Sequence, residues 1–110
     1  MRNTASDDRI SVVAAIIAAS LTAQQVRDRT NLPWERVKSA LAYLRRRDIA
    51  RHVGGGYYRA NQLDCAGCSR SGRTMKGQAV YIDPETFRWF CEECWDAEAE
   101  HVKELVGANG

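Results

Sequence analysis

Four cysteines constrain the fold of this 110-residue chain more than any other feature. They form two C-x2-C pairs with 22 residues between the pairs, and the chain has no other cysteine. Pairs at this spacing are typical of a structural zinc site, in which four thiolates fill every coordination position of the ion. Two disulfides are the alternative, but they require a secretory context, and none is evident. The spacing therefore predicts one Zn²⁺ bound by Cys65, Cys68, Cys91 and Cys94.

The apolar run near the N-terminus bears on where the protein resides. This run covers residues 12–19, far fewer than the ~20 residues that span a bilayer. Asp7 and Asp8 stand where a signal peptide would have a basic flank. The composition, 45% hydrophobic and 27% charged, is that of an ordinary globular domain and excludes disordered and collagen-like classes. We therefore expect a cytoplasmic protein with no membrane partner.

Charge is distributed unequally along the chain. Residues 1–60 contain eleven Lys/Arg and five Asp/Glu, a net of +6, whereas residues 61–110 contain five and nine, a net of −4. Such asymmetry is typical of a chain with one nucleic-acid face and a separate second face, although two modules with unrelated surfaces would also produce it. We place a domain boundary near residues 59–63, which predicts domains 1–60 and 61–110.

The basic half has the pattern of three helices and a hairpin. The first helix carries Ile10, Val13, Ile17 and Leu21 at helical spacing and is apolar nearly all round. Thr22 and Gln25 fit a capping box for the second helix. Pro33 suits the start of the third, whose apolar face is formed by Val37, Ala40, Leu41 and Leu44. Three glycines, residues 54–56, then join two short strands in a turn that requires positive φ angles.

The segment LTAQQVRDRTNLPWERVKSALAYLRRRDIARHVGGGYYRA resembles the winged helix-turn-helix of bacterial and archaeal transcription regulators, and the resemblance covers residues 9–60. It implies that the third helix enters the major groove of duplex DNA with its N-terminal residues at base edges. Base-edge roles fall on Glu35, Arg36, Lys38 and Ser39, and phosphate or minor-groove roles on Arg45, Arg46, Arg51 and Arg59. We expect Trp34 to pack at the edge of the core rather than at a base.

The acidic half begins with the Cys65–Cys68 knuckle. A strand over residues 78–82, a turn at 83–86 and a strand over 87–90 are expected to follow. The second cysteine pair then leads into a helix that ends at Gly107. Knuckle, hairpin and helix in this order resemble a treble-clef zinc finger. Some treble-clef proteins are nucleases with a histidine near the hairpin, but this hairpin has none. No phosphate loop or nucleophile motif is evident either, so we expect no enzymatic activity.

Together these features predict an α+β protein, a winged helix-turn-helix followed by a knuckle–hairpin–helix zinc module. The predicted function is a DNA-binding transcriptional regulator with a structural zinc site and duplex DNA as its partner. The alternative is a non-enzymatic accessory factor or inhibitor, of phage or plasmid type, that docks on a protein or nucleoprotein complex through the winged helix or the acidic zinc module. In that case the acidic C-terminal helix is the candidate protein-binding surface.

The first helix also raises the question of oligomeric state. It carries more apolar surface than one small three-helix core is expected to cover, which predicts a homodimer through this helix. The alternative is that its extra face packs on the zinc module of the same chain, against Trp89, Phe90 and Trp95.

Overall fold

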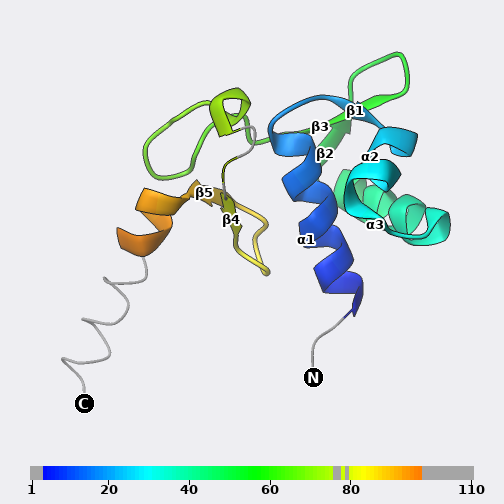
Figure 1. The fold of residues 1–110 in the computed structure, drawn as a ribbon, viewed down its shortest axis with the longest axis horizontal. Coiled ribbons are helices and arrows are strands. Elements are labelled where there is room, and N and C mark those ends of the chain that lie inside the picture. Colours follow the sequence, from blue (N-terminus) through cyan, green and yellow to red (C-terminus); the bar gives the residue numbers. More distant parts are fainter. Residues whose placement is uncertain (1–3, 76–77, 79, 98–110) are drawn as a thin grey trace.

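One central helix, α1 (Thr4–Ile17), lies between two small antiparallel sheets in the computed structural model, which describes residues 4–75, 78 and 80–97 (Figure 1). The chain is therefore of mixed α and β structure. The first half contains β1 (Leu21–Thr22), α2 (Ala23–Thr30), α3 (Trp34–Arg46), β2 (Ala50–His52) and β3 (Tyr57–Ala60). The second contains the 3₁₀ helix η1 (Gly72–Met75), β4 (Val80–Ile82), β5 (Trp89–Cys91) and a helical segment at residues 92–97. No helix in the described part of the chain is long and apolar enough to cross a membrane.

Helix α1 begins earlier than the apolar pattern suggests and also ends earlier. It starts at Thr4, and Leu21, expected on the same helix, belongs to β1. Asp8, Val12 and Ile16 follow one another at intervals of four residues and lie on one face of this helix. All three are buried, with Asp8 7% exposed. A charged residue therefore occupies a position on the core face.

The predicted cap of α2 is confirmed. The backbone N–H of Gln25 donates to Oγ1 of Thr22 over 3.2 Å, and the Thr22 N–H donates to Oε1 of Gln25 over 2.9 Å. This reciprocal pair satisfies two of the backbone donors that a helix N-terminus leaves free. The helix ends at Asn31, whose φ of 57° is left-handed, a conformation that asparagine tolerates better than most residues.

The first sheet has the order β1-β3-β2, with both pairs antiparallel. The glycine turn between β2 and β3 has φ values of 87°, 60° and 79° at residues 54–56, which confirms the predicted positive-φ turn. Ala50 pairs with Ala60 and both are buried, whereas the next pair, Arg51 and Arg59, lies on the opposite face because side chains alternate along a strand. The sheet thus packs one face on the core.

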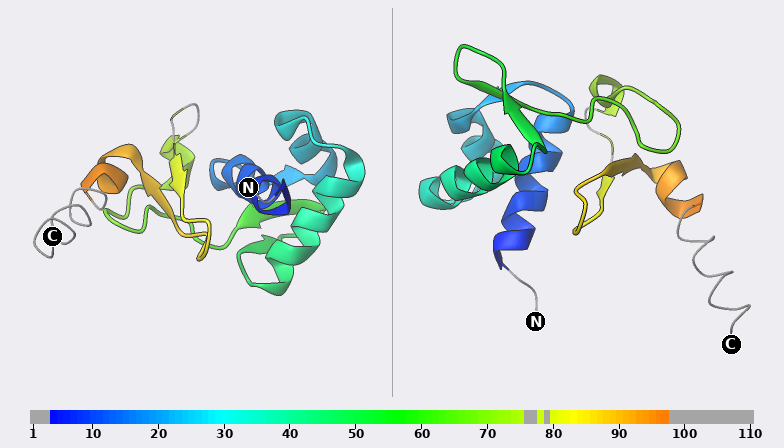
Figure 2. Two further views of the ribbon diagram at one scale, coloured as in Figure 1. Left: turned by 90° about the horizontal axis from the view of Figure 1, so that it is seen from below. Right: turned by 180° about the vertical axis from the view of Figure 1, so that it is seen from behind.

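The core continues from the first half of the chain into the second (Figure 2), where α1 is seen between α3 and the β4–β5 hairpin. Val12 is 0% and Ile16 1% exposed within a single chain. The dimer prediction rested on surplus apolar surface on this helix. Because the same chain buries that surface, the reason for the prediction no longer applies, and the alternative of packing against the second half describes the observed arrangement.

One close contact joins the second half to the first, and a second ties the start of the second half to β5. A Cβ atom at Gly72 would stand 2.7 Å from the carbonyl oxygen of Ile17, so η1 lies directly on the end of α1. The side chain of Gln62 accepts from the N–H of Trp89 (3.0 Å) and donates to its carbonyl (2.8 Å). In return the Trp89 indole donates to the Gln62 carbonyl over 3.1 Å. These three hydrogen bonds hold Gln62 against β5.

Candidate metal centre and basic surface

The four cysteines converge although 22 residues separate the pairs. Cys65 and Cys68 lie in a tight turn in which the Ser69 N–H donates to the Cys65 carbonyl. Cys91 is the last residue of β5, and Cys94 lies in the helical segment that follows. The hairpin is shorter than predicted: β4 begins at Val80, and β5 begins at Trp89 because residues 83–87 form a turn closed by the Asp83 side chain and a left-handed Phe87.

The sulfur geometry suits a tetrahedral ion. All four Sγ atoms lie within 4.8 Å of one another, and those of Cys68 and Cys91 are 3.7 Å apart. Sulfurs bound at ~2.3 Å to a tetrahedral zinc ion stand about 3.8 Å apart. None of the four is in a disulfide. The cluster is therefore compatible with a metal ion such as zinc, and four thiolates would leave no open coordination position for catalysis.

Backbone amides prepare one thiol of this cluster for ligation. Burial by itself raises the pKa of Cys65, but N–H groups of Cys91, Gly67 and Cys68 point at its sulfur, and together they lower the pKa to about 6. Two of these hydrogen bonds measure 3.2 Å, from Cys91, and 3.4 Å, from Gly67. By contrast, hydrogen bonds with the Cys91 and Cys68 thiols raise the pKa of Cys94. A divalent cation at the cluster would neutralise the negative charge that its thiolate ligands carry.

Gly67, inside the Cys65–Cys68 knuckle, has a steric role. A Cβ atom there would lie 2.8 Å from both Cβ and Sγ of Cys94. Any larger residue would therefore push the second cysteine pair away from the first. Aromatic packing supports the same arrangement, since Trp95 stacks on Tyr81 with ring centroids 5.6 Å apart and also contacts Phe90.

The residues assigned to DNA lie mostly on exposed surface. Glu35, Lys38 and Ser39 are exposed on α3, with Lys38 Nζ 3.3 Å from a Glu35 carboxylate oxygen. Arg45 places its guanidinium 6.0 Å from the Tyr58 ring centroid, toward β3. Arg46 and Arg51 are exposed and Arg59 is half-buried. In the described part of the chain no carboxylate pairs with these last three arginines.

Arg36 differs from its neighbours because its side chain already has a partner. Its Nε and Nη2 atoms donate to the two carboxylate oxygens of Asp8 over 2.7 and 2.6 Å. The hydrogen bond to Asp8 raises the pKa of the guanidinium. The fork of donors that would bind a guanine is therefore engaged with α1. The sequence did not predict that Asp8 would pair with Arg36, although the spacing of Asp8 from Val12 and Ile16 places it on the buried face of α1.

Trp34 is exposed, contrary to the expectation that it packs at the core edge. Its exposed fraction is 39%. Arg27 and Lys38 have their charged groups 5.8 and 5.9 Å from its ring centroid. As the first residue of α3, Trp34 adds an aromatic surface between two cations at the end of the helix that was assigned to the major groove.

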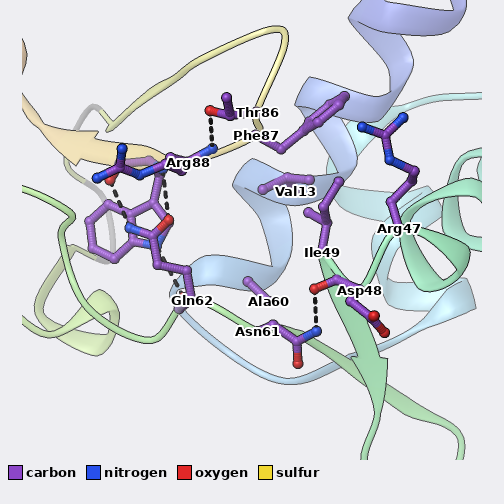
Figure 3. Close-up of a pocket in the computed structure, with 11 residues that line it drawn as sticks. Val13, Arg47, Asp48, Ile49, Ala60, Asn61, Gln62, Thr86, Phe87 and Arg88 are labelled. Atoms are coloured by element: carbon purple, nitrogen blue, oxygen red, sulfur yellow. Dashed lines mark hydrogen bonds between the residues drawn. The ribbon is translucent and has the colours of Figure 1, made fainter.

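A groove of about 370 Å³ runs between the two halves (Figure 3). Arg47 and Arg88 lie on opposite sides of it in this view, and Val13, Phe87 and Trp89 form apolar parts of its wall. Its lining has a single carboxylate, Asp48, and neither histidine nor cysteine. This groove therefore lacks the paired acid and base that general acid–base catalysis requires.

Comparisons with known proteins find no match for this chain. No family model matches the chain, and neither the curated proteins nor the solved structures include a match. The residues and their geometry therefore carry the functional argument.

Proposed function

We propose that this chain is a DNA-binding regulator built on a winged helix-turn-helix, with Zn²⁺ as a structural ion at the four cysteines. The element order α1-β1-α2-α3-β2-β3 and the sheet order β1-β3-β2 support this fold assignment. In such a fold α3 is the recognition helix and the β2–β3 hairpin is the wing. The first half would then be the DNA-binding module, residues 1–60, and residues 61–110 the metal module.

The observation that carries the proposal is the two-sided character of α3. Val37, Ala40, Leu41 and Leu44 are at most 3% exposed, whereas the opposite face presents small and basic side chains to solvent. Ser39 and Ala42 on that face permit close approach to a base edge. Lys38 and Arg46 flank them and supply charge for bases and phosphates.

Arg36 has a different role in this proposal from the one that the resemblance implies. Because Asp8 engages Nε and Nη2, we assign Arg36 to positioning α3 on α1. Base reading then falls on Glu35, Lys38 and Ser39. Arg45, Arg46, Arg51 and Arg59 remain the phosphate-binding residues.

Selection of binding sites from a pool of random duplexes tests the proposal. The wild-type chain is expected to enrich a sequence motif. Ser39→Leu, which removes the close approach of α3, should abolish the enrichment, and Arg46→Ala should weaken binding to all sequences alike. If no duplex is recovered above the background binding to the solid support, the proposal is refuted.

A second candidate function is docking on a protein. One observation favours it: Glu92, Glu93 and Asp96 are exposed on the helical segment after β5. In the described residues only Glu93 has a cationic partner, Arg70 at 3.6 Å. A basic protein surface would complement this segment. This function would be identified if the chain cross-links to a protein partner and Glu92→Lys abolishes the cross-link while DNA binding stays unchanged.

A further inference from the structure

The outer face of the β1-β3-β2 sheet carries two like charges in direct opposition. Arg51 of β2 is the cross-strand partner of Arg59 of β3. Directly opposed residues in an antiparallel pair have Cβ atoms about 4.5–5.5 Å apart, and like charges at that spacing destabilise the sheet. No carboxylate among the described residues pairs with either arginine. The fold therefore retains a repulsion that a bound anion would relieve.

A third cation, Arg73 from the second half of the chain, lies next to Arg59. Arg73 of η1, Arg59 of β3 and Ser20 line one surface hollow of about 40 Å³ at the end of α1. Figure 1 shows η1 and the β2–β3 hairpin on either side of that end of the helix. No acidic residue lines the hollow. Arg73, like Arg51 and Arg59, has no ion-pair partner in the part of the chain that the structure describes.

The size of the hollow restricts its occupant. Pockets for small molecules measure about 300–1,000 Å³, so this hollow is too small for a nucleobase or a cofactor. A single phosphate group resting at its rim could instead accept hydrogen bonds from arginine forks and the Ser20 hydroxyl. Leu63 is the one large apolar side chain exposed at this hollow, whereas a protein partner would require a wider apolar centre.

We propose that Arg51, Arg59 and Arg73 bind backbone phosphates of nucleic acid, so that the metal module contacts the nucleic acid together with the basic half. The inference rests on the proposed DNA-binding function and extends it to a surface beyond α3. It assigns a role to Arg73, which lies in the acidic half, where the charge distribution along the sequence gave no reason to expect a nucleic-acid contact.

The test measures duplex affinity of the full-length, metal-loaded chain as a function of salt. Arg73→Gln should weaken binding to a labelled random duplex about 3- to 10-fold at low salt and reduce the slope of log affinity against log salt by about 0.9, the value for one lost phosphate contact. Arg70→Gln is the matched control, because it removes the same charge from the same module but from a residue paired with Glu93.

The outcomes separate this inference from the proposed function. If Arg73→Gln binds as Arg70→Gln does while Lys38→Gln weakens binding, the inference is wrong and DNA binding through α3 stands. If the wild-type chain binds no duplex, the proposed function fails and this inference fails with it. If Arg73→Gln impairs binding to polyglutamate but leaves duplex binding unchanged, an acidic protein is the partner and the inference is overturned.

A second measurement needs no nucleic acid. Arg51→Gln removes one charge of the opposed pair, and we expect it to raise the melting temperature at low salt by roughly 1–5 °C. Arg51→Lys keeps the charge and should leave the melting temperature close to that of the wild type. If Arg51→Gln raises it no more than Arg51→Lys does, the supposed repulsion is absent and the argument for an anion at this face fails.

Discussion

Arg36 on α3 and Asp8 on α1 form a two-pronged ion pair in which both carboxylate oxygens accept a hydrogen bond. The Asp8 side chain is 9% exposed and that of Arg36 44%, so the pair connects the core face of one helix to the exposed surface of the other. In a winged helix-turn-helix this contact would set the angle of the recognition helix. We therefore expect this pair to act through the position of α3 rather than through a base.

The first prediction concerns this pair. Asp8→Asn should lower the melting temperature, because it leaves a buried amide beside a cation that has lost its partner. Asp28→Asn is the matched control, since Asp28 is exposed and its nearest cation is the adjacent Arg27 at 3.9 Å. Thermal unfolding followed by circular dichroism measures the difference. Equal melting temperatures for the two variants would show that the pair does not hold α3 on α1.

The second prediction concerns the metal. One Zn²⁺ should bind per chain, and a Co²⁺-substituted protein should show the absorption of a tetrahedral thiolate site. Binding should release protons and weaken as the pH falls, because only deprotonated thiols ligate the ion. Elemental analysis of the purified chain gives the stoichiometry. A folded chain with no bound metal and no free thiols would contradict the prediction and indicate two disulfides.

The third prediction distinguishes two glycines by what they contact. Gly67→Ala should reduce metal affinity, because its Cβ would collide with Cys94. Gly72→Ala should instead lower the free energy of unfolding by about 1–3 kcal/mol, the usual cost of overpacking, because its Cβ would meet the backbone of Ile17. Competition with a zinc chelator and chemical denaturation measure the two effects. Weaker metal binding in Gly72→Ala than in Gly67→Ala would reverse the assignment.

The fourth prediction concerns the contact between Gln62 and β5. Gln62→Ala should lower the free energy of unfolding by about 1–3 kcal/mol, because it leaves the backbone N–H of the buried Trp89 without its acceptor, while the Trp89 carbonyl keeps only its hydrogen bond from the Ala66 N–H. Gln24→Ala, on the exposed surface of α2, is the control and should be neutral. A single cooperative transition is expected in both variants, because the core is continuous between the halves. An equal loss of stability in Gln24→Ala would contradict the prediction that the Gln62 side chain stabilises β5.

Local patterns predicted those parts of the fold that depend on neighbouring residues. The capping box at Thr22 and the positive-φ glycine turn both follow from short-range stereochemistry. The cysteine cluster was equally accessible, because C-x2-C spacing reflects the geometry of the ion rather than of the fold. In each case the relevant partners lie within a few residues or are specified by chemistry.

Contacts between distant residues could not be predicted in the same way. The pairing of Asp8 with Arg36 requires α1 and α3 to cross at one particular position. The burial of α1 by η1 and β4 depends on how the second half folds back, which is why its apolar surface suggested a dimer. Trp34 was expected to pack at the edge of the core, but its place at the start of α3 leaves it exposed.

The fifth prediction is the central one: α3 binds duplex DNA. Fluorescence anisotropy with a labelled random duplex, titrated at about 50 mM and again at about 200 mM salt, measures it most directly, because phosphate contacts release counterions and make affinity fall steeply with salt. Lys38→Gln and Arg46→Gln should weaken binding, and Arg70→Gln, with the same loss of charge on the other module, should not. Saturable binding that weakens with salt and depends on Lys38 and Arg46 is the predicted result. No binding to any duplex at the lower salt, or equal effects of all three substitutions, would contradict it.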